Sequence, residues 1–219
     1  KILPIGDFSS LKKKEFNYIS NKKILIIAGN INTFKFNNII HNKNEAIFKE
    51  DQLKSFFDNL DKKIENIYFK DHPNDVRRDI SLSKILKKNK VHLKVINEGK
   101  NFDHILNKYE LLIYPYQFAT PFLKYLLLNK PSLSLFEIDY IEDKVKNDFE
   151  PLFKSNILHS SMKNMALFLN KNYHNIRSWW ESSETQKARI LFCQKYIKNK
   201  INFDFLIEEL KKEQKILYK

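Results

Sequence analysis

The 219-residue chain has a single cysteine, only three glycines and no long apolar segment. Cys193 on its own cannot form an intrachain disulfide, and no cysteine and histidine spacing fits a zinc site. No apolar run approaches the roughly 20 residues that span a membrane, and the first ten residues lack the apolar stretch of a signal peptide. These absences predict a domain in a reducing compartment, without a metal, a bound cofactor or a membrane span.

The charge balance is strongly basic, since 39 Lys and Arg outweigh 26 Asp and Glu to give a formal net charge of +13. A composition of 42% hydrophobic and 14% aromatic residues nevertheless indicates a folded chain. The lysines are scattered through nearly every segment, which is typical of a solvated surface. The alternatives are a surface that binds nucleic acid and one that attracts anionic nucleotides or a membrane.

Short apolar runs alternate with helical patterns along the first two thirds of the chain. The apolar runs predict strands over residues 23–28, 66–70, 91–96, 111–114 and 132–136. Helical patterns occupy residues 53–64, 76–88, 102–108 and 120–128. Near-continuous apolar strands that alternate with helices are typical of a parallel sheet covered on both faces.

Beyond Asp143 the strand signals cease, and apolar residues recur at helical spacing in two groups: Met162, Met165, Ala166 and Leu169, then Phe203, Leu206, Ile207 and Leu210. We therefore predict the α/β class, with a Rossmann-like parallel sheet, helices on both of its faces and a C-terminal helical extension. The predicted parts are a connector over residues 1–21, the Rossmann-like domain over 22–145, and the extension over 146–219 packed on it.

In an open parallel sheet, ligands bind beyond the carboxyl ends of the strands, where loops and helix N-termini gather. Three segments should meet there: Gly29-Asn30, Lys70 to Asp75, and Pro115 to Thr120. Thr120 followed by Pro121 predicts an N-cap and a proline at the first helical position. The unpaired N–H groups of this helix would suit the phosphates of a nucleotide. The alternative is that Thr120 only caps a structural helix.

The sequence Lys70-Asp71-His72-Pro73 stands at the end of the second predicted strand. Lys70 supplies positive charge, His72 can donate to a phosphate or move a proton near neutral pH, and the proline stiffens the loop. An isolated histidine is more often a surface or packing residue, but its expected place on the ligand edge favours binding. The candidate binding residues are Asn30, Lys70, His72, Arg77, Gln117, Ala119 and Thr120.

Two further segments carry aromatic or polar side chains in an unusual arrangement. Asn129 tolerates the left-handed backbone conformation, so it is expected to end the helix that starts at Thr120. Trp179-Trp180 is followed by Gln186 and Arg189. Paired tryptophans at a helix end can fill the gap between a helical tail and a neighbouring sheet, which is the expected role here. The alternative is stacking on a base or sugar, with Arg189 reaching an anion.

Taken together, these segments resemble the C-terminal, donor-binding half of a GT-B glycosyltransferase. The resemblance is carried by Lys70-x-His72-Pro73 after a strand, followed by Leu112-Ile-Tyr-Pro115, Thr120-x-Phe-Leu123 and Asn129-Lys-Pro131. The histidine-proline and threonine loops resemble those of bacterial sialyltransferases and capsule Kdo transferases. With the Trp-Trp-x-Ser…Gln-x-Ala-Arg…Phe tail, the chain resembles transferases of bacterial surface-carbohydrate loci over residues 22 to 200.

The resemblance implies binding of a nucleotide-sugar donor by the domain over residues 22–145. Lys70 and His72 would lie near the donor phosphates, and Thr120 with the backbone amides that follow it would grip them. The reaction would displace the nucleotide at the anomeric carbon, with positive groups stabilising the leaving phosphate and no required metal. Ala119 stands where related enzymes commonly carry a second hydroxyl residue. The acceptor and the general base would belong to an N-terminal domain that this chain is expected to lack, so no catalytic residue is assigned.

The function that follows is a glycosyltransferase, or its donor-binding half, in bacterial surface polysaccharide biosynthesis. Its expected partners are a nucleotide-sugar donor and a glycan or lipid-linked acceptor, without a specific nucleic acid. Its expected location is the cytoplasm, including the inner face of the membrane. A basic nucleic-acid-binding module and a non-catalytic interaction domain of the same fold stay open as alternatives, and neither requires Lys70 or His72.

Overall fold

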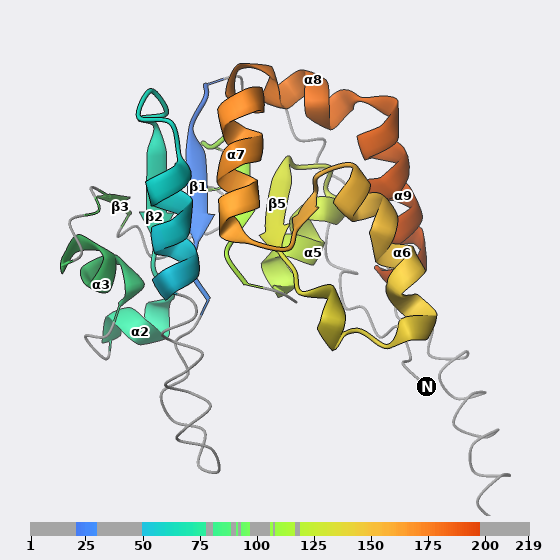
Figure 1. The fold of residues 1–219 in the computed structure, drawn as a ribbon, viewed down its shortest axis with the longest axis horizontal. Coiled ribbons are helices and arrows are strands. Elements are labelled where there is room, and N and C mark those ends of the chain that lie inside the picture. The colour runs from blue at the N-terminus through green and yellow to red at the C-terminus, as the bar shows by residue number, and fades with distance from the viewer. Residues whose placement is uncertain are drawn as a thin grey trace, which may run out of the picture.

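Six parallel strands form one sheet in the order β3-β2-β1-β4-β5-β6 (Figure 1). The computed structural model describes residues 21–29, 50–77, 81–88, 91, 93–96, 106, 108–116 and 119–197. Within them, the strands are β1 (Ile24–Ile27), β2 (Ile67–Lys70), β3 (Lys94–Val95), β4 (Leu111–Tyr114), β5 (Ser132–Leu135) and β6 (Leu158–His159). The predicted Rossmann-like α/β class is confirmed.

Helices cover both faces of the sheet; in Figure 1, α7 and a helix over residues 50–59 lie in front of it and α5 lies behind. The other helices follow in chain order: α2 (Pro73–Arg77), α3 (Leu82–Lys88), α5 (Thr120–Leu127), α6 (Asp143–Lys154), α7 (Met162–Asn172), α8 (Ile176–Glu181) and α9 (Ser183–Tyr196). Two 3-10 turns, η1 (Ile138–Tyr140) and η2 (Tyr173–Asn175), complete the described elements.

The side chains of β1 alternate between two hydrophobic cores. Ile24 and Ile26 pack on the face that carries helix 50–59, α3 and α7. Leu25 and Ile27 pack on the opposite face, with α5, α6 and α9. All four side chains are buried, because a parallel sheet between two helical layers has no solvent face. This double burial explains why the strands are continuous apolar runs in the sequence.

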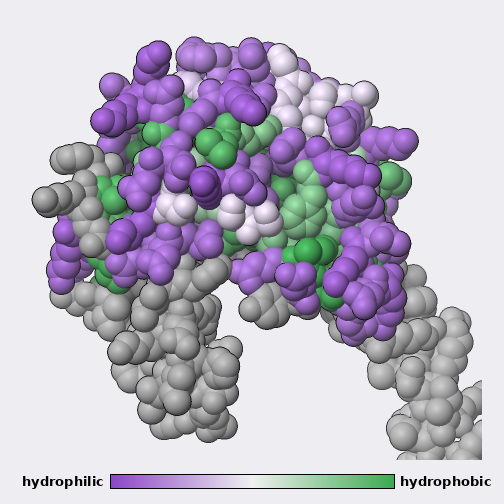
Figure 2. Space-filling model, in the orientation of Figure 1, coloured by the Kyte–Doolittle hydropathy of each residue, from purple (hydrophilic) through white to green (hydrophobic). Residues whose placement is uncertain are grey.

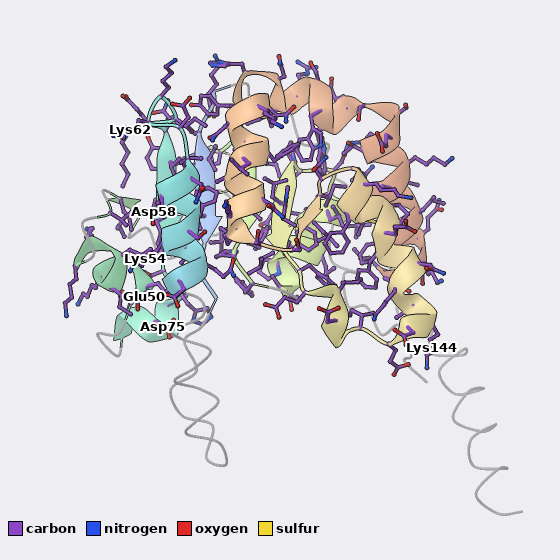
Figure 3. All side chains as sticks on the ribbon, viewed as in Figure 1. Glu50, Lys54, Asp58, Lys62, Asp75 and Lys144 are labelled. Atoms are coloured by element: carbon purple, nitrogen blue, oxygen red, sulfur yellow. The ribbon has the colours of Figure 1, made fainter. Side chains whose placement is uncertain are left out.

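Helix 50–59 shows how the charged residues are accommodated. Figure 3 shows Glu50, Lys54 and Asp58 following one another along this helix, four residues apart in the sequence, with Lys62 beyond its end. Opposite charges at this spacing lie on one helical face and attract one another modestly. Leu53 and Phe56 are buried on the other face. For this helix, the interpretation of the scattered charges as a solvated surface holds.

Four predicted boundaries differ from the structure. The helix predicted over residues 53–64 ends at residue 59, before a turn at residues 62–63. The third strand is limited to Lys94–Val95, and the helix predicted over residues 76–88 is two helices, because Pro73 starts α2 and a separate cap starts α3. The expectation of no strand beyond Asp143 is wrong, since β6 pairs with β5 and extends the sheet past residue 145. With two residues, β6 is too short for a periodic signal. The predicted connector over residues 1–21 lies outside the described residues, apart from residue 21. The helix predicted over 203–210 also lies outside them, as does most of the helix predicted over 102–108.

The buried histidine at the end of β6 makes stability sensitive to acid. His159 is 5% exposed, and burial lowers its pKa from 6.5 to about 4. Between these two values the unfolded chain binds a proton that the folded chain does not, so stability falls as the pH drops from 6.5 toward 4. We expect this histidine to contribute a loss of up to about 1.4 kcal/mol per pH unit. Urea unfolding of wild type and His159→Gln at pH 7 and pH 5 measures it: the variant should lose less stability, and parallel losses would contradict the assignment.

Helix α5 ends in a Schellman turn. Asn129 adopts a φ of 60°, the left-handed conformation predicted from the sequence. Around it, the Lys130 N–H donates to the Tyr125 carbonyl at 2.9 Å, and the Asn129 N–H donates to the Leu126 carbonyl at 3.2 Å. This pair of hydrogen bonds ends α5 and turns the chain into β5.

Side chains of the extension bind this turn from outside. The Trp180 indole N–H donates to the Asn129 backbone oxygen at 3.1 Å and to its side-chain oxygen at 3.0 Å. Gln186 donates to the Trp180 carbonyl at 2.7 Å. Arg189 donates to the Leu126 carbonyl at 3.1 Å and to Gln186 at 3.0 Å. We call Asn129, Trp180, Gln186 and Arg189 the α5 clamp, and it gives Trp180 the packing role expected of it.

The clamp predicts a large loss of stability for Trp180→Phe. Trp180 is 2% exposed, so the smaller ring leaves a cavity and removes the donor to Asn129. We expect a loss of about 2–4 kcal/mol in the free energy of unfolding. Leu191→Ala on α9, where the side chain is 51% exposed, is the control and should change stability by less than about 0.5 kcal/mol. Equal effects of the two substitutions in urea unfolding would show that the clamp is dispensable.

Candidate functional site

The strand order changes direction beside β1. From β1 the chain proceeds outward to β2 and β3 on one side, and later to β4, β5 and β6 on the other. The two neighbours of β1 are parallel to it, so β2, β1 and β4 end at the same edge of the sheet. In doubly wound sheets, the crevice outside this switch point is where ligands bind. We call it the β1 edge.

His72 and Thr120 both lie at the β1 edge, on either side of the end of β1. His72 follows β2, and Thr120 follows β4. The end of β1 is joined to that of β2 by the Ala28 N–H, which donates to the Lys70 carbonyl at 2.9 Å. Lys70 is 9% exposed and His72 is half-buried. The geometry therefore brings together the two segments that the sequence indicated most strongly.

The histidine-proline pair is a helix start rather than a stiffened loop. The His72 carbonyl accepts from the N–H groups of Asp75 at 3.0 Å and Val76 at 3.2 Å, and Pro73 is the first residue of α2. Proline suits this position because its fixed φ is helical and no N–H is needed. Figure 3 shows Asp75 and Glu50 at this end of the molecule, with Lys62 at the opposite end.

Asp71 has a role that sequence reasoning missed. Its carboxylate accepts from the Ser83 N–H at 3.0 Å and from the Ser83 hydroxyl, and the side chain is buried. A carboxylate that binds first-turn N–H groups stabilises a helix start, here that of α3. This contact fixes the path of the chain between Lys70 and His72. The only sequence signal of this contact is the pair of serines, Ser81 and Ser83, near the start of α3.

Gly29 is required by a close approach at the end of β1. A Cβ atom at this position would lie 2.9–3.1 Å from the ring of Tyr116, closer than carbon atoms normally approach. Tyr116 follows β4, and burial raises the pKa of its hydroxyl to about 12. Its backbone carbonyl accepts from the Ser134 hydroxyl at 3.2 Å. The Tyr116 ring therefore packs directly on the backbone at the switch point.

The start of α5 corrects one detail of the prediction. Ala119, not Thr120, is the N-cap residue, and Pro121 is the second helical residue rather than the first. Alanine offers no side-chain acceptor, and no side-chain hydrogen bond caps the helix. The boundary shifts because Ala119 has an extended ψ of 115° while Thr120 is already helical. Thr120 is exposed, so its hydroxyl and the first-turn N–H groups lie at the β1 edge.

The remaining predicted residues are distributed as follows. Asn30 and Gln117 lie outside the described residues, and Arg77 ends α2 with a side chain that is not described. Arg189 belongs to the α5 clamp, at the end of α5 opposite Thr120. Burial of Trp180 excludes its stacking on a ligand.

Two other features bear on the site. Among the described residues, no group of three histidine, cysteine or acidic side chains could hold a metal ion. Two cavities lined by described residues lie away from the β1 edge, one beside β3 and one beside β6. No helix in the part of the chain that the structure describes is both long and apolar enough to cross a bilayer.

Comparison with known proteins gives the family. Residues 1–213 match the model of the LIC12162 family transferases. The chain belongs to this family. It is therefore a transferase by family, which confirms the broad expectation from the sequence.

No curated protein matches the chain. Among solved structures, the chain is similar to one of the wall teichoic acid polymerase TagF with CDPG, at 17% identity and a TM-score of 0.46. That match covers 91% of this LIC12162-family chain and 45% of the TagF chain. The chain thus spans about half the length of TagF.

The close approach at Gly29 predicts a strong coupling with Tyr116. Gly29→Ala should destabilise the chain by about 1–3 kcal/mol, because the new methyl group overlaps the tyrosine ring. In a Tyr116→Ala background the same change should cost less than about 0.5 kcal/mol. A double-mutant cycle in urea unfolding measures the difference, and additive effects would show that the ring does not constrain residue 29.

Proposed function

We propose that this LIC12162-family chain is the donor-binding half of a glycosyltransferase that uses a nucleotide-sugar in bacterial surface polysaccharide biosynthesis. The observation that carries the proposal is the placement of His72 and Thr120 on either side of the β1 end. Membership of a transferase family supports it, as does the doubly wound sheet, because that architecture binds nucleotides at the switch point. The proposed donor-binding domain is residues 22–145.

The charges of the β1 edge suit a diphosphate. Lys70 and His72 can both donate to phosphate oxygens, and the first-turn N–H groups of α5 add the positive end of a helix dipole. Asp71 adds a negative charge nearby, but its carboxylate is directed at the first turn of α3, where it accepts from Ser83 and the positive helix end offsets its charge. Asn30, Arg77, Gln117 and Ala119 complete the proposed donor-binding set through their positions on the adjoining segments.

The proposed reaction is a displacement at the anomeric carbon. An acceptor hydroxyl forms the new bond to that carbon, while the bond to the nucleotide phosphate breaks and its electron pair passes to the phosphate oxygen. Lys70, His72 and the α5 amides stabilise the negative charge that develops on that oxygen. The acceptor would be a glycan or lipid-linked glycan. An N-terminal domain would bind this acceptor and would supply the base that takes its proton. The proposed setting is the cytoplasm or the inner face of the membrane.

Nucleotide titration of His72→Ala tests the proposal. Wild type should bind at least one of CMP, UDP, GDP or their sugars, and the variant should bind it roughly ten- to a hundredfold more weakly, because a charge-assisted hydrogen bond is lost. The matched control is His174→Ala, an exposed histidine whose Nδ1 lies 3.1 Å from Lys22 Nζ, before the start of β1. Equal affinity of the His72→Ala and wild-type chains, or an equal loss in the control, would contradict the proposal.

Thr120→Ala separates binding from stability. Because Ala119 is the N-cap, removing the Thr120 hydroxyl costs no side-chain cap, so thermal unfolding should be unchanged. Nucleotide affinity should fall by roughly three- to tenfold through the lost phosphate contact. A lower melting temperature with unchanged affinity would make Thr120 a structural residue.

Salt dependence distinguishes the nucleic-acid alternative. Nucleotide binding at one pocket should weaken modestly as salt rises, whereas binding along a duplex backbone should fall by orders of magnitude between about 50 and 200 mM salt. Tight, steeply salt-dependent binding to unrelated duplexes, without nucleotide binding, would favour the alternative.

A further inference from the structure

A second cavity lies at the far end of the sheet, along the edge strand β6. Its volume of about 590 Å³ is within the range of small-molecule sites. Its walls come from the end of α6, from β6, and from α7 and α8: Phe153, Asn156, Leu158, His159, Ser160, Asn164, Leu167, Phe168, Lys171, Asn172 and Trp179. Figure 2 shows hydrophobic surface among polar side chains on the face that carries α6 and α7.

His159 in the cavity wall has an unpaired nitrogen. The side chain is 5% exposed, and its Nε2 is buried without a hydrogen-bond partner. The ring hydrogen-bonds to the backbone of Asn156, which leaves Nε2 as the acceptor of a neutral imidazole. Buried acceptors are normally satisfied, so this nitrogen lacks a donor that a ligand in the cavity can supply.

Phe168 packs beside this histidine, and Trp179 packs on Phe168. Trp179 and Phe168 are half-buried and meet edge to face, with ring centroids 5.1 Å apart. The Trp179 indole N–H donates to the Ser155 carbonyl at 2.8 Å, which holds the ring in place. The Phe168 centroid is 5.4 Å from that of His159, so the Phe168 ring lies beside the imidazole. A fixed, partly exposed indole is suited to stacking on a flat apolar surface.

The polar side chains of the cavity offer both donors and acceptors. The Asn172 amide nitrogen donates to the Phe168 carbonyl at 3.0 Å, and that of Asn164 donates to the Ser160 hydroxyl at 3.3 Å. Each amide nitrogen has a second N–H, and each amide oxygen can accept, so both amides can pair with hydroxyl groups, which donate and accept. His159 Nε2 needs a donor, which a hydroxyl supplies and a fully ionised phosphate does not.

We propose that this cavity binds a neutral saccharide. The sugar ring stacks on Trp179, one hydroxyl donates to His159 Nε2 once the Phe168 ring beside it moves aside, and others pair with the amide groups of Asn164 and Asn172. The site is separate from the β1 edge, because β6 lies three strand positions from β1, or about 14 Å at the usual strand spacing. It goes beyond the proposed function: it would hold a glycan chain near the transferase whether or not the donor binds at the β1 edge.

Tryptophan emission provides the assay, because the chain has two tryptophans and Trp180 is buried in the α5 clamp. Titration with glucose, N-acetylglucosamine and maltose should give a saturable change from Trp179, at concentrations up to tens of millimolar for a small ligand. Uracil, which is flat and has no hydroxyl group, is the comparison ligand. A saturable response to none of the three saccharides, or tighter binding of uracil, overturns the proposal.

Variants link the response to the cavity. His159→Gln and the exposed Asn164→Ala should each weaken saccharide binding roughly three- to tenfold, while Asn175→Ala, an exposed asparagine outside the cavity, should not. His72→Ala should leave saccharide binding unchanged, so failure of the donor site and failure of this site are distinguishable. If Asn164→Ala folds as wild type and binds saccharide equally well, the assignment is wrong.

Discussion

The position of β1 between β2 and β4 is the constraint on which the rest of the structure depends. Its four side chains are buried in two separate cores, so helices must cover both faces of the sheet. Its parallel neighbours bring the ends of β2 and β4 to one edge. Gly29 then lets the Tyr116 ring pack on the end of the strand. The candidate site is thus a consequence of strand order, since it uses residues more than 40 positions apart in the sequence.

The two ends of the segment from Thr120 to Pro131 make different contacts. Its start faces the β1 edge without a side-chain cap, whereas its end is held by Trp180 and Arg189 at the opposite edge. Lys130, which follows Asn129 at the end of this segment, is buried. Desolvation lowers the pKa of Lys130 to about 8, and the negative charge of Glu110 partly opposes this lowering. Asn129 and Trp180 are therefore explained by packing, and the clamp keeps α5 in a fixed position relative to the sheet.

Strand positions and the parallel sheet could be predicted because residues buried on two faces leave a continuous apolar signal. The shared edge of His72 and Thr120 followed from that topology. Contacts between distant residues left no such signal: the carboxylate of Asp71 at the start of α3, the Tyr116 ring over Gly29, and the unpaired nitrogen of His159. The N-cap was misplaced by one residue because threonine is a good cap, whereas backbone geometry selects Ala119.

The central claim is that a nucleotide-sugar binds at the β1 edge. A crystal structure of the chain with the tightest-binding nucleoside diphosphate tests it most directly. The account predicts the phosphates at the first turn of α5, within hydrogen-bond distance of the Thr120 hydroxyl and with His72 on the other side. A nucleotide bound in the cavity beside β6, or with its phosphates away from α5, would contradict it.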